Sequence, residues 1–379
     1  MQTLFFLNVL IVAYTWIGYP AVLLILRWKW ARPSLQTGSA AQPSVSIIVA
    51  AHNEEKSIAE KLEDTLRLRY PRELLEIIVA SDGSTDRTEE AVTRFAVNDS
   101  RIRLLRTERA GKSHAQNNAV REAKGDIIFF TDVNTRTRPD LLETIVKNFI
   151  DLEVGMVTVT VHFGHPGGAI ASGQGLYWRF ELFLRAAESA IGILAAGSGQ
   201  GLALRRSLFR PMPSFYGDDC VLPLDVRLQG YRVVQDAQAV VFDVMPHSIE
   251  GELRARVRMT ARNWTGTLSR PGLLNPFRFP LTAWALISHK LLRWLTPLFL
   301  LFALFCNSLL FFKWPFWLFW IGQVVFYMAA LVGWLRTRRS LRAWLFAYPF
   351  SFCLANLGFL LGLVKVVRSE RITAYQSDG

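Results

Sequence analysis

The sequence is poor in cysteine and in charged residues. Its three cysteines, Cys220, Cys306 and Cys353, lack the spacing of a metal site or of a disulfide framework. Such cysteine usage is typical of proteins that face a reducing compartment such as the cytosol. Only 20% of the residues are charged, yet the formal net charge is +12, so the basic excess must lie outside the apolar stretches. No nucleic-acid-binding motif is present, which leaves anionic lipid headgroups or a phosphorylated substrate as partners for this charge.

We also expect no cleavable signal peptide, and 51% of the residues are hydrophobic. The uncharged stretch Thr3–Leu26 is long enough to cross a bilayer, and it has no basic segment before it and no small-residue cleavage site. Arg27 and Lys29 follow at once, and positive charge beside a span favours the cytoplasmic side. We therefore expect residues 1–28 to form a transmembrane helix at a cell inner membrane or plasma membrane, and residues 44–270 to form a cytoplasmic domain.

Apolar segments return after Pro280. Residues 271–290 are expected to form an interfacial segment, and residues 291–368 about three transmembrane helices before a tail at 369–379. The expected spans are Leu292–Phe312, Phe316–Leu335 and Trp344–Val367. Three crossings from the cytoplasm would place the basic tail outside, against the positive-inside rule. Either the last segment, which Pro349 interrupts, is partly re-entrant or interfacial, or the charge rule is overruled there.

Strand and helix patterns alternate in the domain between these membrane segments. Single helical patterns separate runs of β-branched and other apolar residues, which is typical of a parallel sheet with right-handed crossovers and predicts the α/β class. The expected strands are Val45–Ala50, Glu76–Ala80, Ile102–Leu105 and Ile127–Phe130, and the expected helices are Asn53–Leu68, Thr88–Asn98, Ser113–Lys124 and Leu141–Phe149.

Past Asp140 the pattern is less regular. The sequence predicts strands at Met156–Phe163, Val233–Val234 and Val240–Val244 and a strongly basic helix at Glu252–Thr265. A further helix, Tyr177–Leu194, has an aromatic face and the charged residues Arg179, Glu181, Arg185 and Glu188. It either lies in the membrane interface or covers the sheet, and periodicity does not separate these alternatives.

Polar side chains follow three of the predicted parallel strands. They are Asn53 with Glu54, Asp82 with Gly83 and Ser84, and Asp132 with Asn134. Because ligands bind beyond the carboxyl ends of strands in open α/β sheets, these turns are expected to line one site. Their oxygen atoms suit Mg²⁺ or Mn²⁺, which neutralises a diphosphate. Taken singly, each turn is equally well explained by local turn formation, and Asp86 is expected to cap the helix that begins at Thr88.

Four segments, in this order and spacing, resemble the family 2 glycosyltransferases. They are Ser46–Glu55, Ser81–Asp86, Gly111–Asn117 and Thr131–Asn134. More narrowly, the chain is similar to the membrane-bound bacterial branch that includes hyaluronan, chitin and cellulose synthases, over about residues 45–266. The resemblance implies a Rossmann-like glycosyltransferase-A fold with flanking transmembrane helices and a nucleotide-sugar donor.

The resemblance also implies roles for the residues at the strand ends. Asp82 and Glu54 would contact the base and ribose, and Asp132 would coordinate the metal. Asn53 and Gly83 are candidate donor-binding residues in the same motifs, and Gly83 would let the backbone approach a ligand closely. The family's D-x-D pattern has Asn134 in place of its second acid, and an amide oxygen is a weaker ligand. His247 is a further candidate ligand, with a surface histidine as the alternative.

Lys112 lies in a Gly-Lys-Ser sequence that is not a P-loop. Position 106 is Arg, where that motif needs its first glycine. In the family, a lysine here is directed at the donor. The alternative is a solvated turn lysine.

Gly217–Leu222 resembles the acidic motif whose second acid is the catalytic base. Inverting transfer needs one carboxylate to remove the proton from the attacking hydroxyl, and two adjacent acids in a cleft raise one pKa. We favour Asp219 over Asp218 for this role. The alternative is a helix N-terminus decorated with acids.

Two later segments complete the resemblance. The glycine-rich segment Gly197–Arg206 resembles the family's acceptor site, which would place Gly199 and Gln200 beside a sugar ring, although such loops also occur for structural reasons. The Q-x-x-R-W motif of polymerising synthases corresponds to residues 258–264, where the glutamine is replaced by Met259. Arg258 and Arg262 would clamp a diphosphate or contact lipid headgroups, and Trp264 would lie on the acceptor side.

These features predict inverting, metal-dependent transfer from a nucleotide sugar, most simply a UDP-sugar, at the cytoplasmic membrane face. The acceptor is either a growing polysaccharide, with export and polysaccharide secretion partners, or a lipid-linked acceptor that receives a single sugar. The missing glutamine weighs against processive polymerisation. A transporter whose soluble domain senses nucleotide is a third alternative. The expected spans are few and, apart from their ends, nearly free of ionisable residues, which weighs against it. An inactive scaffold is a fourth, against which the surviving acid pair argues.

Overall fold

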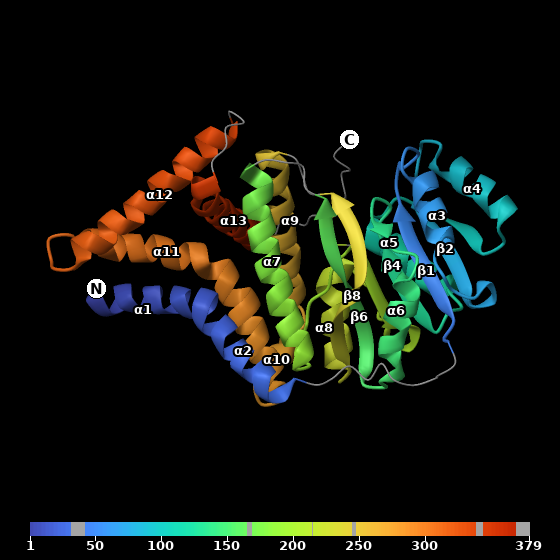
Figure 1. Cartoon of the computed structure of the whole chain (residues 1–379), viewed down its shortest axis with the longest axis horizontal. Coiled ribbons are helices and arrows are strands. Elements are labelled where there is room, and N and C mark those ends of the chain that lie inside the picture. Colours follow the sequence, from blue (N-terminus) through green and yellow to red (C-terminus); the bar gives the residue numbers. More distant parts are fainter. Residues whose placement is uncertain (32–41, 165–168, 214, 245–247, 339–343, 369–379) are drawn as a thin grey trace.

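The computed structural model describes residues 1–31, 42–164, 169–213, 215–244, 248–338 and 344–368. Figure 1 shows an α/β domain at one end of the molecule and a group of long helices at the other. Two helices, α7 (Ala169–Ala190) and α9 (Ile249–Leu268), stand between the two parts.

The sheet has the strand order β3-β2-β1-β4-β7-β6-β8-β5 in the described part of the chain. Its strands are β1 (Val45–Ala51), β2 (Leu75–Asp82), β3 (Ile102–Thr107), β4 (Ile127–Thr131), β5 (Arg136–Thr137), β6 (Val154–Gly164), β7 (Gly201–Arg205) and β8 (Arg232–Val244). β1 pairs in parallel with both β2 and β4, and β2 with β3, so the predicted parallel sheet is confirmed. The carboxyl ends of these strands therefore meet at one edge.

The remainder of the sheet is mixed. β7 runs antiparallel to β4 and β6, and the sequence did not predict it because its flanks read as a glycine-rich loop. The two strands predicted around Val233 and Val240 are one long strand, β8, which pairs in parallel with β6 across two register shifts. These irregularities let one strand continue through a stretch whose apolar pattern is broken.

Helices cover both faces of the sheet. Alternate residues of β1 pack against α3 (Ile58–Leu66), α4 (Thr88–Asn98) and α6 (Leu141–Lys147) on one face. The other face packs against α5 (Lys112–Glu122) and α8 (Asp218–Leu228). Burial on both faces explains why the parallel strands are continuous β-branched runs.

The helix expected from Asn53 begins only at Ile58. Asn53 adopts a left-handed backbone conformation with φ of 54°, and its side chain accepts a hydrogen bond from the backbone of Thr85 over 2.8 Å. A residue in this conformation cannot continue into an α-helix, so the segment forms a turn first.

In the described part of the chain, four helices are long and apolar enough to cross a membrane by length and composition: Gln2–Trp30, Pro280–Leu309, Phe316–Arg338 (α12) and Leu345–Val367, the last within α13 (Trp344–Val367). The first consists of α1 (Gln2–Ala13), a π-helical turn at Tyr14–Gly18 and α2 (Tyr19–Trp30). The second consists of α10 (Pro280–Ala285), a π-helical turn at Leu286–Leu291 and α11 (Leu292–Leu309).

Two segments in this region have bounds that differ from those expected from the sequence. The segment expected to be interfacial, residues 271–290, includes the start of the second apolar helix, which begins at Pro280. The helix predicted at Tyr177–Leu194, α7, begins earlier and packs against β8 as well as against α2 and α13. It therefore joins the sheet to the long helices. The basic tail, residues 369–379, lies outside the described residues.

Candidate active site

A cavity of about 690 Å³ lies at the carboxyl edge of the parallel strands and extends to the long helices. Its walls come from β1, β2, the turn after β4, the loop before β7 and the starts of α5 and α8, together with α7, α9, α11 and α13. Of the residues singled out in the sequence, it is lined by Glu54, Asp82, Lys112, Asp132, Asn134, Gly199, Gln200, Asp218, Asp219, Arg258 and Arg262. Glu54, Asp82, Asp132 and Asn134, which come from all three strand ends, therefore share one cavity.

Lys112 lies at the centre of the charged groups. It is the first residue of α5, and its Nζ lies 2.7 Å from Oδ1 of Asp132 and 3.2 Å from Oδ2 of Asp218. Burial alone would lower the pKa of Lys112, but the charges of Asp132 and Asp218 outweigh it and hold this pKa above its usual range. Lys112 is thus a fixed positive charge between two carboxylates.

The two acids of the Gly217–Leu222 motif have different surroundings. Asp218 is 3% exposed, and it accepts a hydrogen bond from Nε2 of Gln116 over 2.7 Å. Burial would raise the pKa of Asp218, but Lys112 and Gln116 together lower it. Burial and the neighbouring Asp218 charge raise the pKa of Asp219. Asp218 is therefore held as a carboxylate in an ion pair, whereas Asp219 has the higher proton affinity that suits a general base.

Asp82 uses its carboxylate to hold the loop that leads to Lys112. It is 5% exposed and accepts hydrogen bonds from the backbone of Ala110 at 2.8 Å and of Gly111 at 3.0 Å. Gly111 has φ of 99° and precedes α5. The Asp82 side chain thus orients the start of α5 in addition to lining the cavity.

Gly83 is needed for a contact within the chain. Its φ is 62°, and a Cβ added there would lie 2.9 Å from the backbone nitrogen of Arg109. The sequence suggested that Gly83 admits a ligand, but the group that approaches it is the backbone of Arg109, and Gly83 is not among the described residues that line the cavity.

In the first motif, Ser46–Glu55, Asn53 has a structural contact and Glu54 lines the cavity. Asn53, which holds the backbone of Thr85, is not among the described cavity-lining residues, whereas Glu54 is. Burial and the charge of Asp132 raise the pKa of Glu54. Asp86 accepts a hydrogen bond from the Thr88 backbone over 3.0 Å, as expected for a residue at a helix start, and also one from the Glu55 backbone over 3.1 Å.

The predicted acceptor residues are split between the cavity and the packing of α9. Gly199 faces Asp219, since an added Cβ would lie 3.9 Å from that residue's Cβ, and Gln200 donates to Asp243 over 3.0 Å. Trp264 is not among the described lining residues, and its ring packs 5.7 Å from that of Trp294 on α11. The physical reason is helical spacing, because a residue two positions after Arg262 points to the opposite side of α9.

The predicted metal ligands give a partial site. Asp132, 40% exposed, and Asn134, which is exposed, both line the cavity, and His247 lies outside the described residues. Within the described ranges, no group of three or more His, Cys, Asp or Glu side chains is placed to hold a metal ion. The donor set fits a cation that takes its remaining ligands from a diphosphate, as Mg²⁺ commonly does.

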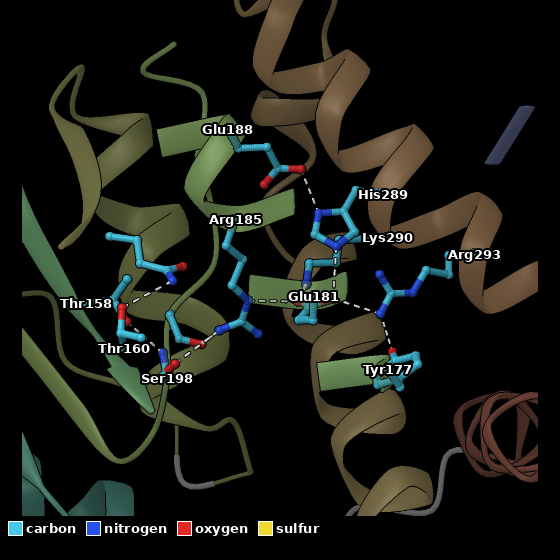
Figure 2. A network of polar contacts seen from close by, with 12 residues as sticks. Thr158, Thr160, Tyr177, Glu181, Arg185, Glu188, Ser198, His289, Lys290 and Arg293 are labelled. Carbon is cyan, nitrogen blue, oxygen red and sulfur yellow. Dashed lines mark hydrogen bonds and ion pairs between the residues drawn. The ribbon is translucent and has the colours of Figure 1, made fainter. Parts of the chain in front are cut away.

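The sequence did not predict a charged cluster at the end of the cavity that is lined by the long helices. Figure 2 shows Glu181 of α7 between Arg185 of the same helix and His289, Lys290 and Arg293 of the Pro280–Leu309 helix. The spacing of Glu181 and Arg185, four residues apart on a helix, was a signal for an ion pair. The expected bounds place His289 and Lys290 in the interfacial segment and Arg293 at the end of the span Leu292–Phe312. In the structure all three residues lie inside the second apolar helix, Pro280–Leu309.

Comparison with known proteins agrees with this architecture. Residues 46–210 match the model of glycosyl transferase family 2. An N-acetylglucosaminyltransferase of Sinorhizobium fredii is 28% identical over 257 residues, covering 61% of this chain and 60% of the relative. A poly-beta-1,6-N-acetyl-D-glucosamine synthase of Staphylococcus aureus is 24% identical over 220 residues, covering 56% of this chain and 53% of the relative. The chain thus spans less than two thirds of the length of these relatives.

Among solved structures, the chain resembles the mannosyltransferase PcManGT from Pyrobaculum calidifontis in complex with GDP-Man and Mn²⁺. The TM-score is 0.73 at 23% identity, and the match covers 97% of this chain and 99% of that one. At this identity the likeness establishes the fold, including the arrangement of the long helices. We conclude that residues 46–210 are similar to glycosyl transferase family 2 and that the chain has a glycosyltransferase-A fold, joined, among the described residues, to four helices that are long and apolar enough to cross a membrane.

Proposed function

We propose that this protein transfers a sugar from a nucleotide sugar to a hydroxyl of a saccharide acceptor, with inversion at the anomeric carbon. One observation carries the proposal: a partly buried acid of raised pKa, Asp219, shares a cavity with the Lys112–Asp132 ion pair at the carboxyl edge of the parallel strands. A base and a fixed cation in one cavity are what nucleophilic displacement of a nucleoside diphosphate requires.

In this proposal Asp219 removes the proton from the acceptor hydroxyl as its oxygen attacks the anomeric carbon. The bond from that carbon to the diphosphate oxygen breaks, and the nucleoside diphosphate leaves with the electron pair. Lys112 stabilises the negative charge of the leaving diphosphate. Arg262 also lines the cavity and has a buried Nε with no hydrogen-bond acceptor among the described residues, so it can bind a phosphate oxygen.

A divalent cation, Mg²⁺ or Mn²⁺, would be held by Asp132 and the amide oxygen of Asn134. When bound, it would neutralise the diphosphate. The presence of Lys112 beside Asp132 means that part of this neutralisation is already supplied by the chain. Removal of the metal should therefore weaken donor binding strongly without abolishing it.

The relatives' names favour an N-acetylglucosamine donor, and hence a UDP-sugar. They also favour a growing polysaccharide as product, with a lipid-linked acceptor as the alternative. Arg27 and Lys29, which end the first apolar helix, support a cytoplasmic domain at a cell inner membrane or plasma membrane, where activated sugars are available. Export of a polymer, with polysaccharide secretion partners, would then use the long helices.

The direct test is a screen of nucleotide sugars for hydrolysis by the purified protein, with and without Mn²⁺. We expect one donor class to be hydrolysed to nucleoside diphosphate and sugar, and chelation to reduce the rate. Radiolabelled donor with membranes separates the two products, since a ladder of polymer excludes single transfer. Absence of hydrolysis and of transfer for every donor would refute the proposed function.

A further inference from the structure

The membrane-side end of the cavity holds a concentration of buried cations. Glu181 lies 2.7 Å from Nε of Arg185, 3.2 Å from Nζ of Lys290 and 2.7 Å from Nη2 of Arg293. These cationic side chains are 8%, 13% and 5% exposed, respectively. One carboxylate therefore faces three buried cations. Burial would raise the pKa of Glu181, but these cations lower it, so its charge is present and is still outnumbered.

The second carboxylate of the cluster does not reach these cations. Glu188 contacts Nδ1 of His289 over 2.6 Å and accepts a hydrogen bond from the hydroxyl of Tyr19 over 2.6 Å. Even with His289 counted as neutral, three cations are opposed by two carboxylates. A buried excess of positive charge is costly unless an anion compensates it.

Arg293 has hydrogen-bonding capacity that the chain does not use. Its Nη2 donates to Glu181 and to the hydroxyl of Tyr177, but its Nε and Nη1 are buried without an acceptor among the described residues. The side chain lines the cavity, as do those of Lys290 and Arg185. Nε–H and Nη1–H can each donate a hydrogen bond to a phosphate oxygen.

The position of the cluster indicates where the anion comes from. Towards the α/β domain, Arg185 donates to the carbonyl of Gly197 and to the hydroxyl of Ser198, which precede Gly199, the residue that faces Asp219. In the other direction, Trp294 of α11 and Phe359 of α13 line the same cavity. Lys290 lies in the π-helical turn of the Pro280–Leu309 helix, and such turns occur often at functional sites.

We propose that Arg293 and Lys290, together with Arg185, form a subsite for the phosphate of a membrane-anchored acceptor: a saccharide carried on a phosphate- or diphosphate-bearing lipid. The phosphate binds at this cluster, the lipid chain lies against the apolar helices, and the terminal sugar hydroxyl reaches Asp219. The inference rests on the proposed function and names its acceptor. The same bonds form and break as in the proposed function: the hydroxyl proton passes to Asp219 and the nucleoside diphosphate leaves.

The test compares two synthetic acceptors with the full-length protein in detergent. Both carry the same sugar on a decyl chain, one through a diphosphate and one through a direct glycosidic bond. We expect the diphosphate acceptor to have about a tenfold higher kcat/KM. Arg293→Gln should abolish this preference by raising KM for the diphosphate acceptor to about that of the neutral acceptor. Arg278→Gln, an exposed arginine ahead of the same helix, is the matched control and should keep the preference.

A second measurement needs no variant. Decyl phosphate should inhibit transfer competitively with the diphosphate acceptor, and inorganic phosphate at the same concentration should not. Equal use of both acceptors by the wild type, or equal inhibition by inorganic phosphate, would overturn the lipid-phosphate subsite. Donor hydrolysis would still proceed in those cases, so the proposed function would stand. Loss of donor hydrolysis in the wild type would instead remove the function and this inference with it.

Discussion

The ammonium of Lys112 lies 2.7 Å from the carboxylate of Asp132 and so joins the start of α5 to the turn after β4. The same ammonium lies 3.2 Å from Asp218 at the start of α8. One lysine therefore brings together three segments that are distant in the sequence. Because this lysine also lines the cavity, donor binding and the positions of both acids are coupled through it.

Replacing Lys112 with Met should lower kcat/KM for donor hydrolysis by about 100-fold, as expected for loss of one charge-stabilising donor. It should also lower the midpoint of thermal unfolding, because the buried Asp218 loses its cation. Steady-state kinetics and a thermal melt measure the two effects. Lys112→Arg should recover part of both, and Lys124→Met, an exposed lysine just beyond the same helix, should behave as wild type. Normal kinetics in Lys112→Met would show that the lysine is not directed at the donor.

The pH profile tests which acid is the base. Asp219 acts only when ionised, and burial with the Asp218 charge raises its pKa, so kcat/KM should fall as the pH drops through a value above the ordinary carboxyl range. Asp218→Asn removes the repulsion and should move this acidic limb to lower pH.

Glu54 is the other acid whose titration could produce the acidic limb of the pH profile. Its pKa is raised by burial and by Asp132 and Asp86, so an acidic limb that belonged to Glu54 would not move in Asp218→Asn. Glu90→Gln, on an exposed part of α4, is the control for nonspecific effects and should leave the profile in place. A limb that stays at the same pH in Asp218→Asn would exclude Asp219 as the titrating base.

Gly83→Ala should destabilise the protein by about 1–3 kcal/mol, the usual cost of a side chain held at an unfavourable backbone conformation. The added Cβ would also displace Arg109, and with it the loop that precedes Lys112, so donor hydrolysis should weaken as well. Gly322→Ala is a matched control, because its Cβ would meet nothing within 4 Å and it lies inside α12. There the change should be neutral or stabilising by about 0.5–1 kcal/mol. The midpoint of thermal unfolding should therefore fall in Gly83→Ala and stay the same or rise in Gly322→Ala.

Lys61 supports the site from inside the domain. It is fully buried, and its Nζ donates to Oγ1 of Thr131 at 3.0 Å and to the carbonyl of Thr135 at 2.8 Å, on either side of Asp132. Lys61→Met should raise KM for the donor about tenfold by loosening this turn. Lys56→Met, at an exposed position ahead of α3, should not. An unchanged KM would mean that the turn is held by other contacts.

The same residue predicts a pH effect on stability. Burial lowers the pKa of Lys61 to about 8 in the folded state, below the unfolded value of about 10.4. The unfolded state therefore binds more protons between these values, and the free energy of unfolding should rise with pH in that window. Lys61→Met should lack this contribution. Chemical denaturation at pH 8 and pH 10 measures the difference, and an equal rise in both proteins would contradict the assignment.

The parallel half of the fold could be predicted because it is encoded locally. Strands such as Ile127–Thr131 are short apolar runs that end in polar turns, and the edge where those turns meet follows from parallel pairing. β7 could not be predicted in the same way, since Gly201–Arg205 becomes a strand only by pairing with β4 and β6. Its strand conformation is a tertiary effect that overrides a loop-like local pattern.

The site shows the same division. Asp132, Lys112 and Asp219 could be identified from motifs, but that Gly83 faces the backbone of Arg109 depends on a loop elsewhere in the chain. The buried cation cluster was harder still, because Glu181 and Arg293 lie on separate helices and meet only when α7 packs beside the second apolar helix. Sequence patterns within one helix carry no information about such partners.

The most direct test of the central claim is the variant Asp219→Asn, assayed for both donor binding and sugar transfer. Asn keeps the size of the side chain but cannot accept the hydroxyl proton. We predict that the nucleotide sugar binds with unchanged affinity while kcat for transfer falls by about 100-fold or more. Transfer at the wild-type rate in this variant would contradict the account of Asp219 as the base in a shared donor and acceptor cavity.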